Sequence, residues 1–439
     1  MAHHFTEAGV TDLAIQYWLK AGQTSQSQSA NIAAIRHFER GLELTMSLPK
    51  SPTRDLLELN LKLPLSGLLM AIKGYAAPEV EPIQNRCIEI ARGVGDDSLL
   101  FTVLIANWEW LFIRGRHEDS FVRCPEVIQL AQALNRPGMK SEAHWCQNCT
   151  SFYSGDFEST RRHALIGAEN YDRIACIEYA KVTQQNSGPL NLAYLGMAQW
   201  QLGYADQAFQ SLHLALEMAM ELKHSFTQAM VLWKVSQTYD FAGLGVQTIE
   251  YADRCLRIAD EQQFAFWSAL ANGCKGVGLK HLGRFDESIN LLKTSILQLE
   301  STGSFILFPK YRSHLAESLW KAGLVEEAQA QLDQALLDQN AGEYFMHAEL
   351  LRIQGDFYFD RGDLDQAEDA YSKSIRVSTQ QNAKMYRLKT TLHLCNLWKH
   401  QNNITAIKTN LKPLYEGFHE GLKMPVLIAA KELLDSLNP

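Results

Sequence analysis

A glycine that follows an apolar segment recurs at a nearly constant interval in the second half of the chain. Its copies lie 40, 40, 40 and 39 residues apart, at Gly203, Gly243, Gly283, Gly323 and Gly362. Five residues after each of them comes a small residue, namely Ala208, Thr248, Ser288, Ala328 and Ala367. A fixed period of about 20 to 50 residues is typical of repeat architectures, in which one supersecondary unit stacks on copies of itself.

Further positions repeat with the same period. A second small residue stands twelve positions after each glycine, at Ala215, Cys255, Ser295, Ala335 and Ser374. Between the two small residues come Leu212, Ala252, Leu292, Leu332 and Tyr371, and seven residues before the glycines stand Gly196, Ser236, Gly276, Ala316 and Gly355. Spacings of three and four residues share one helical face, where small side chains let two helices approach closely. This is the tetratricopeptide pattern lengthened from about 34 to about 40 residues. It predicts an all-α, tetratricopeptide-like α-solenoid, a right-handed superhelix of antiparallel helix hairpins.

The upstream half carries looser copies of the same pattern, at Gly115 and Gly155. The step from Gly155 to Gly203 is 48 residues, and its surplus coincides with the polar, breaker-rich stretch 183–189. We therefore predict divergent helical repeats over 1–182, a loop or hinge over 183–189, regular repeats over 190–412 and a capping helix over 413–439.

Charge and hydropathy exclude several classes of protein. Lys and Arg total 41 against 49 Asp and Glu, which gives a net charge of −8, and no basic cluster offers a track for phosphates. We therefore expect no nucleic-acid partner. No stretch approaches the roughly 20 apolar residues of a spanning helix, so no membrane partner is expected. The N-terminus lacks the pattern of a secretory signal, and eight scattered cysteines indicate reduced thiols in a cytoplasmic protein.

Several segments resemble one known family. These are residues 3–9 (HHFTEAG), 29–35 (SANIAAI), 73–81 (KGYAAPEVE) and 415–422 (YEGFHEGL). They look like the helical-repeat region of large bacterial signalling proteins, where the repeats lie C-terminal to a STAND-type predicted ATPase, often preceded by a class III adenylate or guanylate cyclase domain. The resemblance implies that this chain corresponds to a C-terminal portion of such a protein.

The sequence does not contain the catalytic half of that architecture. No G-x-x-x-x-G-K-[ST] phosphate loop is present, and residues 273–278 (GCKGVG) lack its spacing and its Lys-Ser/Thr pair. We therefore expect no enzyme activity and no cofactor. Two hypotheses stay open. The chain is either a non-enzymatic scaffold or sensor that binds a protein segment and regulates a neighbouring ATPase or cyclase, or a fragment of an adenylate- or guanylate-cyclase-type enzyme whose catalytic domains lie elsewhere.

One cysteine pair suggests a metal site. Cys146 and Cys149 form a C-x-x-C next to His144, which are ligand types that zinc prefers. No second pair follows at zinc-finger spacing, so core packing is the favoured interpretation and no metal is predicted.

A stripe of aromatic and charged residues stands three or ten positions before the repeat glycines and their equivalents. In tetratricopeptide folds these positions line the concave surface, so the stripe predicts a groove for a protein or peptide segment. The alternative is that these aromatics only pack one hairpin against the next. The candidate groove residues are Trp145, Phe152, Trp200, Trp233, Lys280, Trp320, Arg352, Phe359 and Trp398.

The N-terminal end is the last candidate for an interface. It has no capping box and carries Phe5, Ile15, Tyr17 and Trp18 close to the first exposed hairpin surface. Solenoid ends need a polar cap. We therefore expect this end to bind a second copy of the chain or an upstream ATPase or cyclase module.

Overall fold

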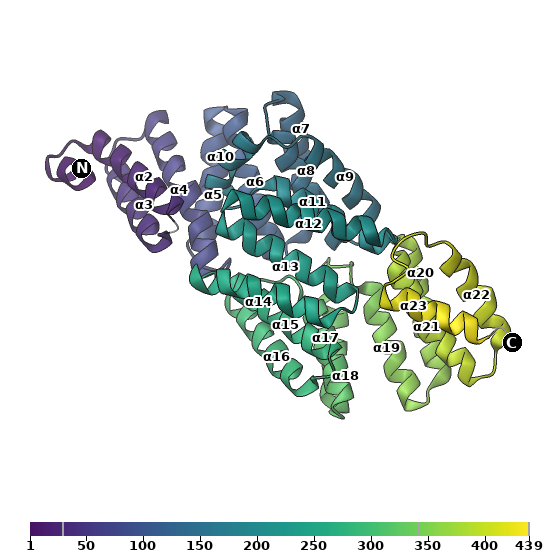
Figure 1. Ribbon diagram of the computed structural model, residues 1–439. Coiled ribbons are helices and arrows are strands. Elements are labelled where there is room, and N and C mark those ends of the chain that lie inside the picture. Colours follow the sequence, from purple (N-terminus) through teal and green to yellow (C-terminus); the bar gives the residue numbers. More distant parts are fainter. Residues whose placement is uncertain (29, 340–341, 438–439) are drawn as a thin grey trace.

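The computed structural model describes residues 1–28, 30–339 and 342–437, and these residues form helices and no strand. The helices pair into antiparallel hairpins that stack into an elongated superhelix, with the chain termini at its two ends (Figure 1). The predicted tetratricopeptide-like solenoid is therefore confirmed. The first helices of the hairpins are α2 (Thr11–Ser27), α4 (Pro52–Lys73), α6 (Asp97–Ile113), α8 (Met139–Tyr153), α11 (Ser187–Leu202), α13 (Ser225–Phe241), α15 (Ala265–His281), α17 (Phe308–Lys321), α19 (His347–Arg361) and α21 (Lys384–His400).

The second helices pack antiparallel to the first. They are α3 (Asn31–Met46), α5 (Val80–Val94), α7 (His117–Leu134), α9 (Phe157–Glu169), α12 (Ala205–Leu222), α14 (Gly245–Glu261), α16 (Phe285–Ser301), α18 (Val325–Asp338), α20 (Leu364–Gln380) and α22 (Ile404–Glu416). Three helices stand outside this scheme: α1 (Ala2–Glu7), α10 (Arg173–Thr183) and α23 (Pro425–Ser436).

The repeat glycines end the first helix of each hairpin. Gly203, Gly243, Gly283, Gly323 and Gly362 have φ angles of 93°, 73°, 74°, 83° and 86°, in the left-handed region that costs glycine little. In the next copy Asn402 takes this conformation with φ 57°. Asparagine tolerates the left-handed region better than most residues, so the turn persists although the glycine has gone.

The small residues of the repeat lie where the two helices of a hairpin meet. A Cβ added to Gly196 would come within 2.6 Å of Leu212 Cγ and 2.7 Å of the Ala208 carbonyl oxygen. At Gly355 an added Cβ would come within 2.5 Å of the Tyr371 ring. The larger residue between the two small ones therefore fills the space that the missing side chain leaves, as the spacing predicted.

The two helices of a hairpin differ in burial. In α11, fifteen of its sixteen residues are buried, whereas α12 buries six of eighteen. A helix that is buried all round lies in the interior, and one with a narrow apolar stripe covers it. From α4 onward the first helices therefore line the interior of the superhelix and the second helices face outward, whereas in the first hairpin α2 is no more buried than α3.

Successive turns of the superhelix touch each other. The backbone N–H of Ala76 donates to the Thr302 carbonyl at 3.2 Å, that of Phe305 to the Ile113 carbonyl at 2.9 Å, and that of Tyr344 to the Tyr153 carbonyl at 2.8 Å. In each pair, a loop that precedes a first helix in the second half of the chain meets the end of a first helix about five hairpins earlier. Helices α4 and α15, and α11 and α21, are also in contact. Elements from the second half of the chain therefore cover first helices of the first half in the middle of the superhelix.

The segment predicted as a loop or hinge is short and buried. Helix α10 supplies the surplus of the long repeat, and α11 begins at Ser187, so the connection contains only residues 184–186. The Gln185 side chain donates to Glu109 at 2.9 Å, and the Asn186 backbone N–H donates to Thr227 Oγ1 at 3.1 Å. The polar residues here bind neighbouring helices, which argues against a hinge.

The two ends of the superhelix are closed by different elements. Helix α23 buries Leu427 and Ala430 and contacts α21 and α22. At the other end Phe5 stacks on Tyr17 with ring centroids 5.1 Å apart, and Trp18 Nε1 donates to Thr6 Oγ1 at 3.1 Å. The short helix α1 therefore covers part of the apolar surface that the sequence leaves without a cap. Within the described ranges, no helix is long and apolar enough to cross a membrane.

Two glycine substitutions distinguish the contact between successive turns of the superhelix from the local cost of a positive φ angle. Gly303 and Gly283 both have positive φ, but an added Cβ at Gly303 would lie 1.9 Å from Ala76 Cβ, whereas at Gly283 it meets nothing within 4 Å. We expect Gly283→Ala to cost about 1 kcal/mol of unfolding free energy for the left-handed backbone. Gly303→Ala should cost about 1–3 kcal/mol more because of the clash.

The measurement is amide hydrogen exchange together with urea unfolding. Gly303→Ala should raise exchange in both residues 74–77 and 302–306, while Gly283→Ala should leave these two segments as in the wild type. Equal effects of the two substitutions would show that the turns of the superhelix are not coupled at this point.

Candidate functional site

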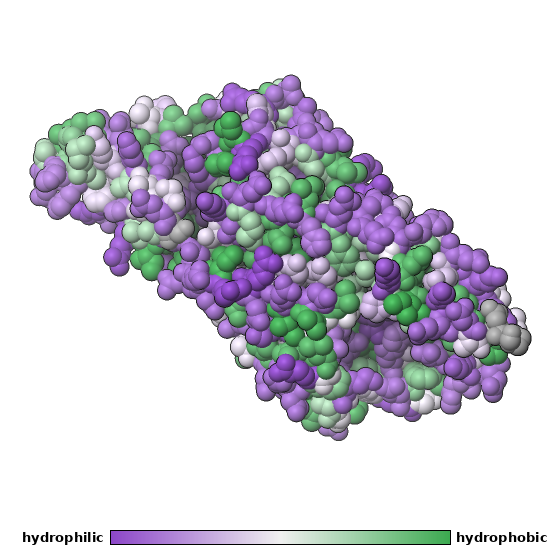
Figure 2. All heavy atoms as spheres, viewed as in Figure 1, coloured by the Kyte–Doolittle hydropathy of each residue, from purple (hydrophilic) through white to green (hydrophobic). Residues whose placement is uncertain are grey.

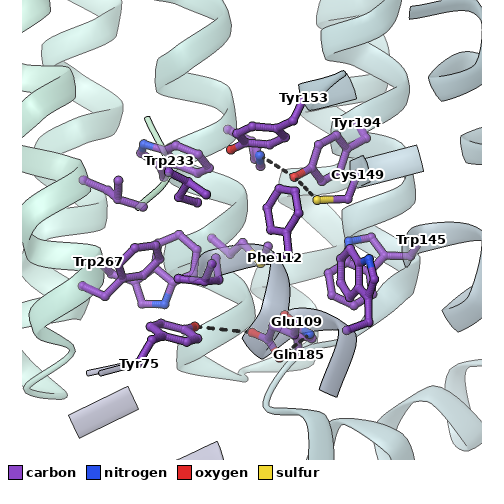
Figure 3. A pocket seen from close by; sticks show the side chains of 17 residues that line it. Tyr75, Glu109, Phe112, Trp145, Cys149, Tyr153, Gln185, Tyr194, Trp233 and Trp267 are labelled. Atoms are coloured by element: carbon purple, nitrogen blue, oxygen red, sulfur yellow. Dashed lines mark hydrogen bonds between the residues drawn. The ribbon is translucent and has the colours of Figure 1, made fainter. Parts of the chain in front are cut away.

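Aromatic side chains fill the centre of the superhelix. They come from α6, α8, α11, α13 and α15 and surround a cavity of about 20 Å³, with room for about one water molecule. Figure 3 shows their rings converging on this space. Trp108 meets Trp145 edge to face at 4.8 Å between centroids, and Phe112 meets Tyr153 at the same distance. The space is a closed core cavity and not an open binding cleft.

A buried lysine is the most unusual side chain beside the cavity. Lys234 is fully buried, and its Nζ donates to Tyr194 OH at 2.7 Å. Nζ also lies 4.0 Å from the centroid of the Tyr194 ring and 4.3 Å from that of Trp233, which favours a cation. Burial nevertheless lowers the pKa of Lys234 to about 7. The Tyr194 hydroxyl also contacts Cys149 Sγ at 2.9 Å, so these three groups form one polar cluster.

A buried carboxyl lies on the opposite side of the cavity. Glu109 accepts a hydrogen bond from Gln185 Nε2 at 2.9 Å and a long one from Tyr75 OH at 3.5 Å (Figure 3). Burial raises the pKa of Glu109 to about 8. Its side chain is therefore mostly protonated near pH 7 and ties the short connection before α11 to α6.

The predicted aromatic stripe does not form one open groove. Trp145 and Trp233 line the closed cavity and are 1% and 2% exposed, and Phe152 packs beside them against Phe345 at 5.4 Å. Trp200 is buried in a separate cluster near the C-terminal end. In these four positions the aromatics pack one hairpin against the next, which is the alternative that the sequence left open.

The other predicted groove residues lie toward the C-terminal end and are partly exposed, except for Arg352. Trp320 stacks on Phe357 with centroids 3.9 Å apart, and its Nε1 donates to Asp360 at 2.8 Å. Trp398 Nε1 donates to Glu368 at 3.0 Å, and Phe359 meets His400 edge to face at 6.2 Å. These three residues lie on successive first helices.

Charged residues replace the aromatics in the interior between α15 and α21. Glu317 joins Lys280 at 2.5 Å and the buried Arg352 at 2.8 Å, and Arg352 also pairs with Glu349. Burial raises the pKa of Glu317, but Lys280 and Arg352 outweigh it and hold this pKa well below its usual range. Figure 2 shows a hydrophilic hollow between α17 and α19. The Glu317–Arg352 ion pair links these two helices.

A second charged group lies one hairpin earlier. Asp240 pairs with His281 at 2.9 Å and with Lys310 at 2.9 Å, and His314 lies 3.5 Å away. Burial raises the pKa of Asp240, but Lys310 and His314 hold it well below the usual range. Lys280 and Arg352 therefore belong to a continuous interior charge network, in which each charge is matched by a partner.

The C-x-x-C pair is part of the core. Cys146 and Cys149 are buried, and burial raises the pKa of Cys149 to about 12, so it stays a thiol. His144 Nδ1 lies 2.8 Å from His163 Nδ1 instead of beside the cysteines. Within the described part of the chain, no group of three or more His, Cys, Asp or Glu side chains could hold a metal ion.

An open groove that the sequence did not reveal lies beside the closed cavity. It has a volume of about 850 Å³ and is lined by α2, α4, α6, α10 and the segments that lead into α11 and α13. Leu63, Pro64 and Phe226 form part of its apolar lining, and Lys20 and Lys223 stand at its exposed edge. We call this space the α10 groove. Its volume is in the range of ligand pockets.

Residues 184–186 separate the α10 groove from the aromatic cavity. Gln185 faces the cavity, whereas Gln184 and Asn186 line the groove. Both side chains are buried, and Asn186 lies beside the Tyr171 hydroxyl. In the sequence, only the polar stretch 183–189 marked this part of the molecule. It predicted a loop or hinge and did not indicate a binding site.

Comparisons with known proteins define the class. No protein-family model matches the chain. The uncharacterized protein R02095 of Rhizobium meliloti (strain 1021) is 23% identical over 396 residues, which cover 87% of this chain but only 37% of that relative. A Rap protein solved with Competence and Sporulation Factor matches with 11% identity and a TM-score of 0.58, over 84% of this chain and 98% of its own.

Cut9, solved with Hcn1 as part of the APC/C, matches with 13% identity and a TM-score of 0.56, over 97% of this chain and 76% of that chain. The chain is thus a tetratricopeptide-like helical-repeat protein. It spans little more than a third of the length of the curated relative that it matches.

The sequence-based prediction that excluded a nucleic-acid partner is wrong. Human IFIT1 solved with PPP-AAAA is among the matching structures, with 14% identity and a TM-score of 0.44 over 97% of this chain and 90% of that chain. A net negative charge of the whole chain does not exclude an anionic ligand, because binding depends on the local charge of the groove.

The buried carboxyl beside the cavity predicts a pH dependence of stability. The pKa of Glu109 is raised from 4.5 to about 8 in the folded state, so the folded protein holds its proton more tightly than the unfolded chain. This contribution is fully present below about pH 4.5 and is lost as the pH rises toward 8. Glu109→Gln keeps a polar side chain for Gln185 and Tyr75 but removes the titration.

We therefore expect Glu109→Gln to gain unfolding free energy relative to the wild type between pH 4.5 and pH 9, by at most about 5 kcal/mol. Urea unfolding at the two pH values measures the change, and other titrating groups cancel in the comparison with the wild type. A difference between variant and wild type that does not vary with pH would contradict the assignment of a protonated Glu109.

Proposed function

We propose that this chain is a non-enzymatic helical-repeat scaffold that binds a protein segment in the α10 groove. The observation that carries the proposal is the groove itself, an opening of about 850 Å³ with the exposed side chains of Lys20 and Lys223 at its edge. Its volume is typical of sites that bind ligands.

Two features of the molecule support a role in binding. The central cavity is too small for a ligand larger than water, and the charges farther along the interior are paired with one another. The fold is shared with Rap, solved with Competence and Sporulation Factor, and with Cut9, solved with Hcn1. In both of those structures a helical-repeat protein is present with a partner.

We further propose that the chain is the regulatory or sensor region of a bacterial signalling ATPase or nucleotide cyclase. The support is the resemblance of residues 3–9, 73–81 and 415–422 to that architecture, together with the greater length of the relative from Rhizobium meliloti. A ligand in the α10 groove would act on the linked module if it bound two conformations of the superhelix with different affinity. Catalysis would then reside outside this chain.

A selection from a random peptide library displayed on phage tests the binding role. Asn60 is exposed and lines the α10 groove, so Asn60→Trp should fill the groove with little effect on folding. Asn290→Trp on α16 is the matched control, because Asn290 is also exposed and lies outside the groove. We expect peptides that bind the wild type and Asn290→Trp but not Asn60→Trp. If every selected peptide binds all three proteins alike, the α10 groove is not the binding site.

The regulatory role is tested on the full-length relative from Rhizobium meliloti. We expect it to bind magnesium ATP in calorimetry, whereas the present chain, which has no phosphate loop, should not. A groove-binding peptide should change the affinity of the full-length relative for ATP by about fivefold or more. An unchanged ATP affinity at saturating peptide would remove the regulatory role and leave the binding role.

A further inference from the structure

We infer that the ligand of the α10 groove is an extended acidic peptide, whose carboxylates meet Lys20 and Lys223 and whose apolar side chains contact the aliphatic lining. The inference rests on the proposed binding function and specifies the partner of that same site. Three properties of the groove lead to it: its charge, the helix ends that line it and its aliphatic lining.

The charge of the groove opposes that of the whole chain. Among its lining residues are Lys20, Lys181, Lys223 and Glu178, and Lys181 already pairs with Glu178 at 2.5 Å. Lys20 and Lys223 have no salt bridge among the described residues, in a chain with a net charge of −8. Burial lowers the pKa of His224 to about 4, so that residue adds no charge near pH 7.

Two helices also begin at the groove. Helix α11 starts after Asn186 and α13 starts after His224, and both of these capping residues line the groove. The N-terminal ends of helices carry partial positive charge, which adds to that of the lysines. An anionic group in the groove is therefore favoured by side chains and backbone alike.

The apolar lining favours a peptide over a nucleic acid. Ile177 from α10 is exposed and Leu99 from α6 and Leu222 from α12 are half-buried, and they contribute aliphatic surface that suits an apolar side chain between acidic ones. Phe226 is only 4% exposed because it packs against Trp267, with centroids 5.4 Å apart. Single-stranded nucleic acids need open aromatic faces and a longer basic track, and the groove offers neither.

The experiment uses the full chain and the peptides whose binding Asn60→Trp abolishes. We expect these peptides to be enriched in Asp and Glu relative to the library. The double variant Lys20→Glu/Lys223→Asn should weaken their binding about tenfold or more in fluorescence anisotropy. Asn at 223 tolerates the left-handed backbone of that residue, which has φ 53°. Lys408→Glu/Lys431→Asn changes the same charges on exposed residues of α22 and α23 and should leave the affinity unchanged.

Far-UV circular dichroism of each variant establishes that it is folded.

Two results would overturn the inference while the binding function stands. The groove-dependent peptides could be neutral or basic, or the lysine variant could bind them like the wild type. Octa-adenylate RNA is the competing probe: if it binds more tightly than every selected peptide and Asn60→Trp abolishes its binding, the groove is a nucleic-acid site. If no groove-dependent peptide is found and the RNA does not bind, the proposed function itself fails.

Discussion

The hydrogen bonds between successive turns of the superhelix determine what its interior can be. A stack of hairpins alone would leave the first helices facing an open concave surface. Here the backbone N–H groups of Ala76, Phe305 and Tyr344 bind carbonyls about five hairpins away, and Gly303 lets two turns come into contact. Because the turns touch, the first helices α6, α8, α11, α13 and α15 are buried on most sides, and their aromatic side chains form a core instead of a groove.

Closure of the interior imposes a requirement on every polar group inside it. A buried charge is costly unless it is paired, and a buried carboxyl without a cation keeps its proton. The network of Glu317, Lys280 and Arg352 meets the requirement by pairing, whereas Glu109 meets it by a raised pKa. Gln184 and Asn186 lie at the open α10 groove, on the other side of the connection that holds Gln185 against Glu109.

The connection between α10 and α11 links these two environments. Gln185 holds the protonated Glu109 at the closed cavity, and its two neighbours face the α10 groove. Phe226 lines the groove and packs on Trp267, which lines the cavity. A ligand in the groove would thus bind directly against residues that set the packing of the central helices. Interiors packed at this density respond to a contact by discrete shifts, which is a physical route from the groove to the rest of the superhelix.

The sequence by itself determined the repeat and the helices. The glycine period, the small residues at Gly196 and Gly355 and the larger ones opposite them are local requirements, since a turn with positive φ and a close pair of helices depend on residues within one repeat. Only the tertiary structure decided which first helices are covered, why Trp145 and Trp233 are core residues, and where the groove opens. Those outcomes depend on contacts between residues about 190 or more positions apart, such as Phe305 and Ile113, and on the insertion of α10. A periodic pattern carries no information about such distant pairs, because each repeat is compatible with an open or a closed superhelix.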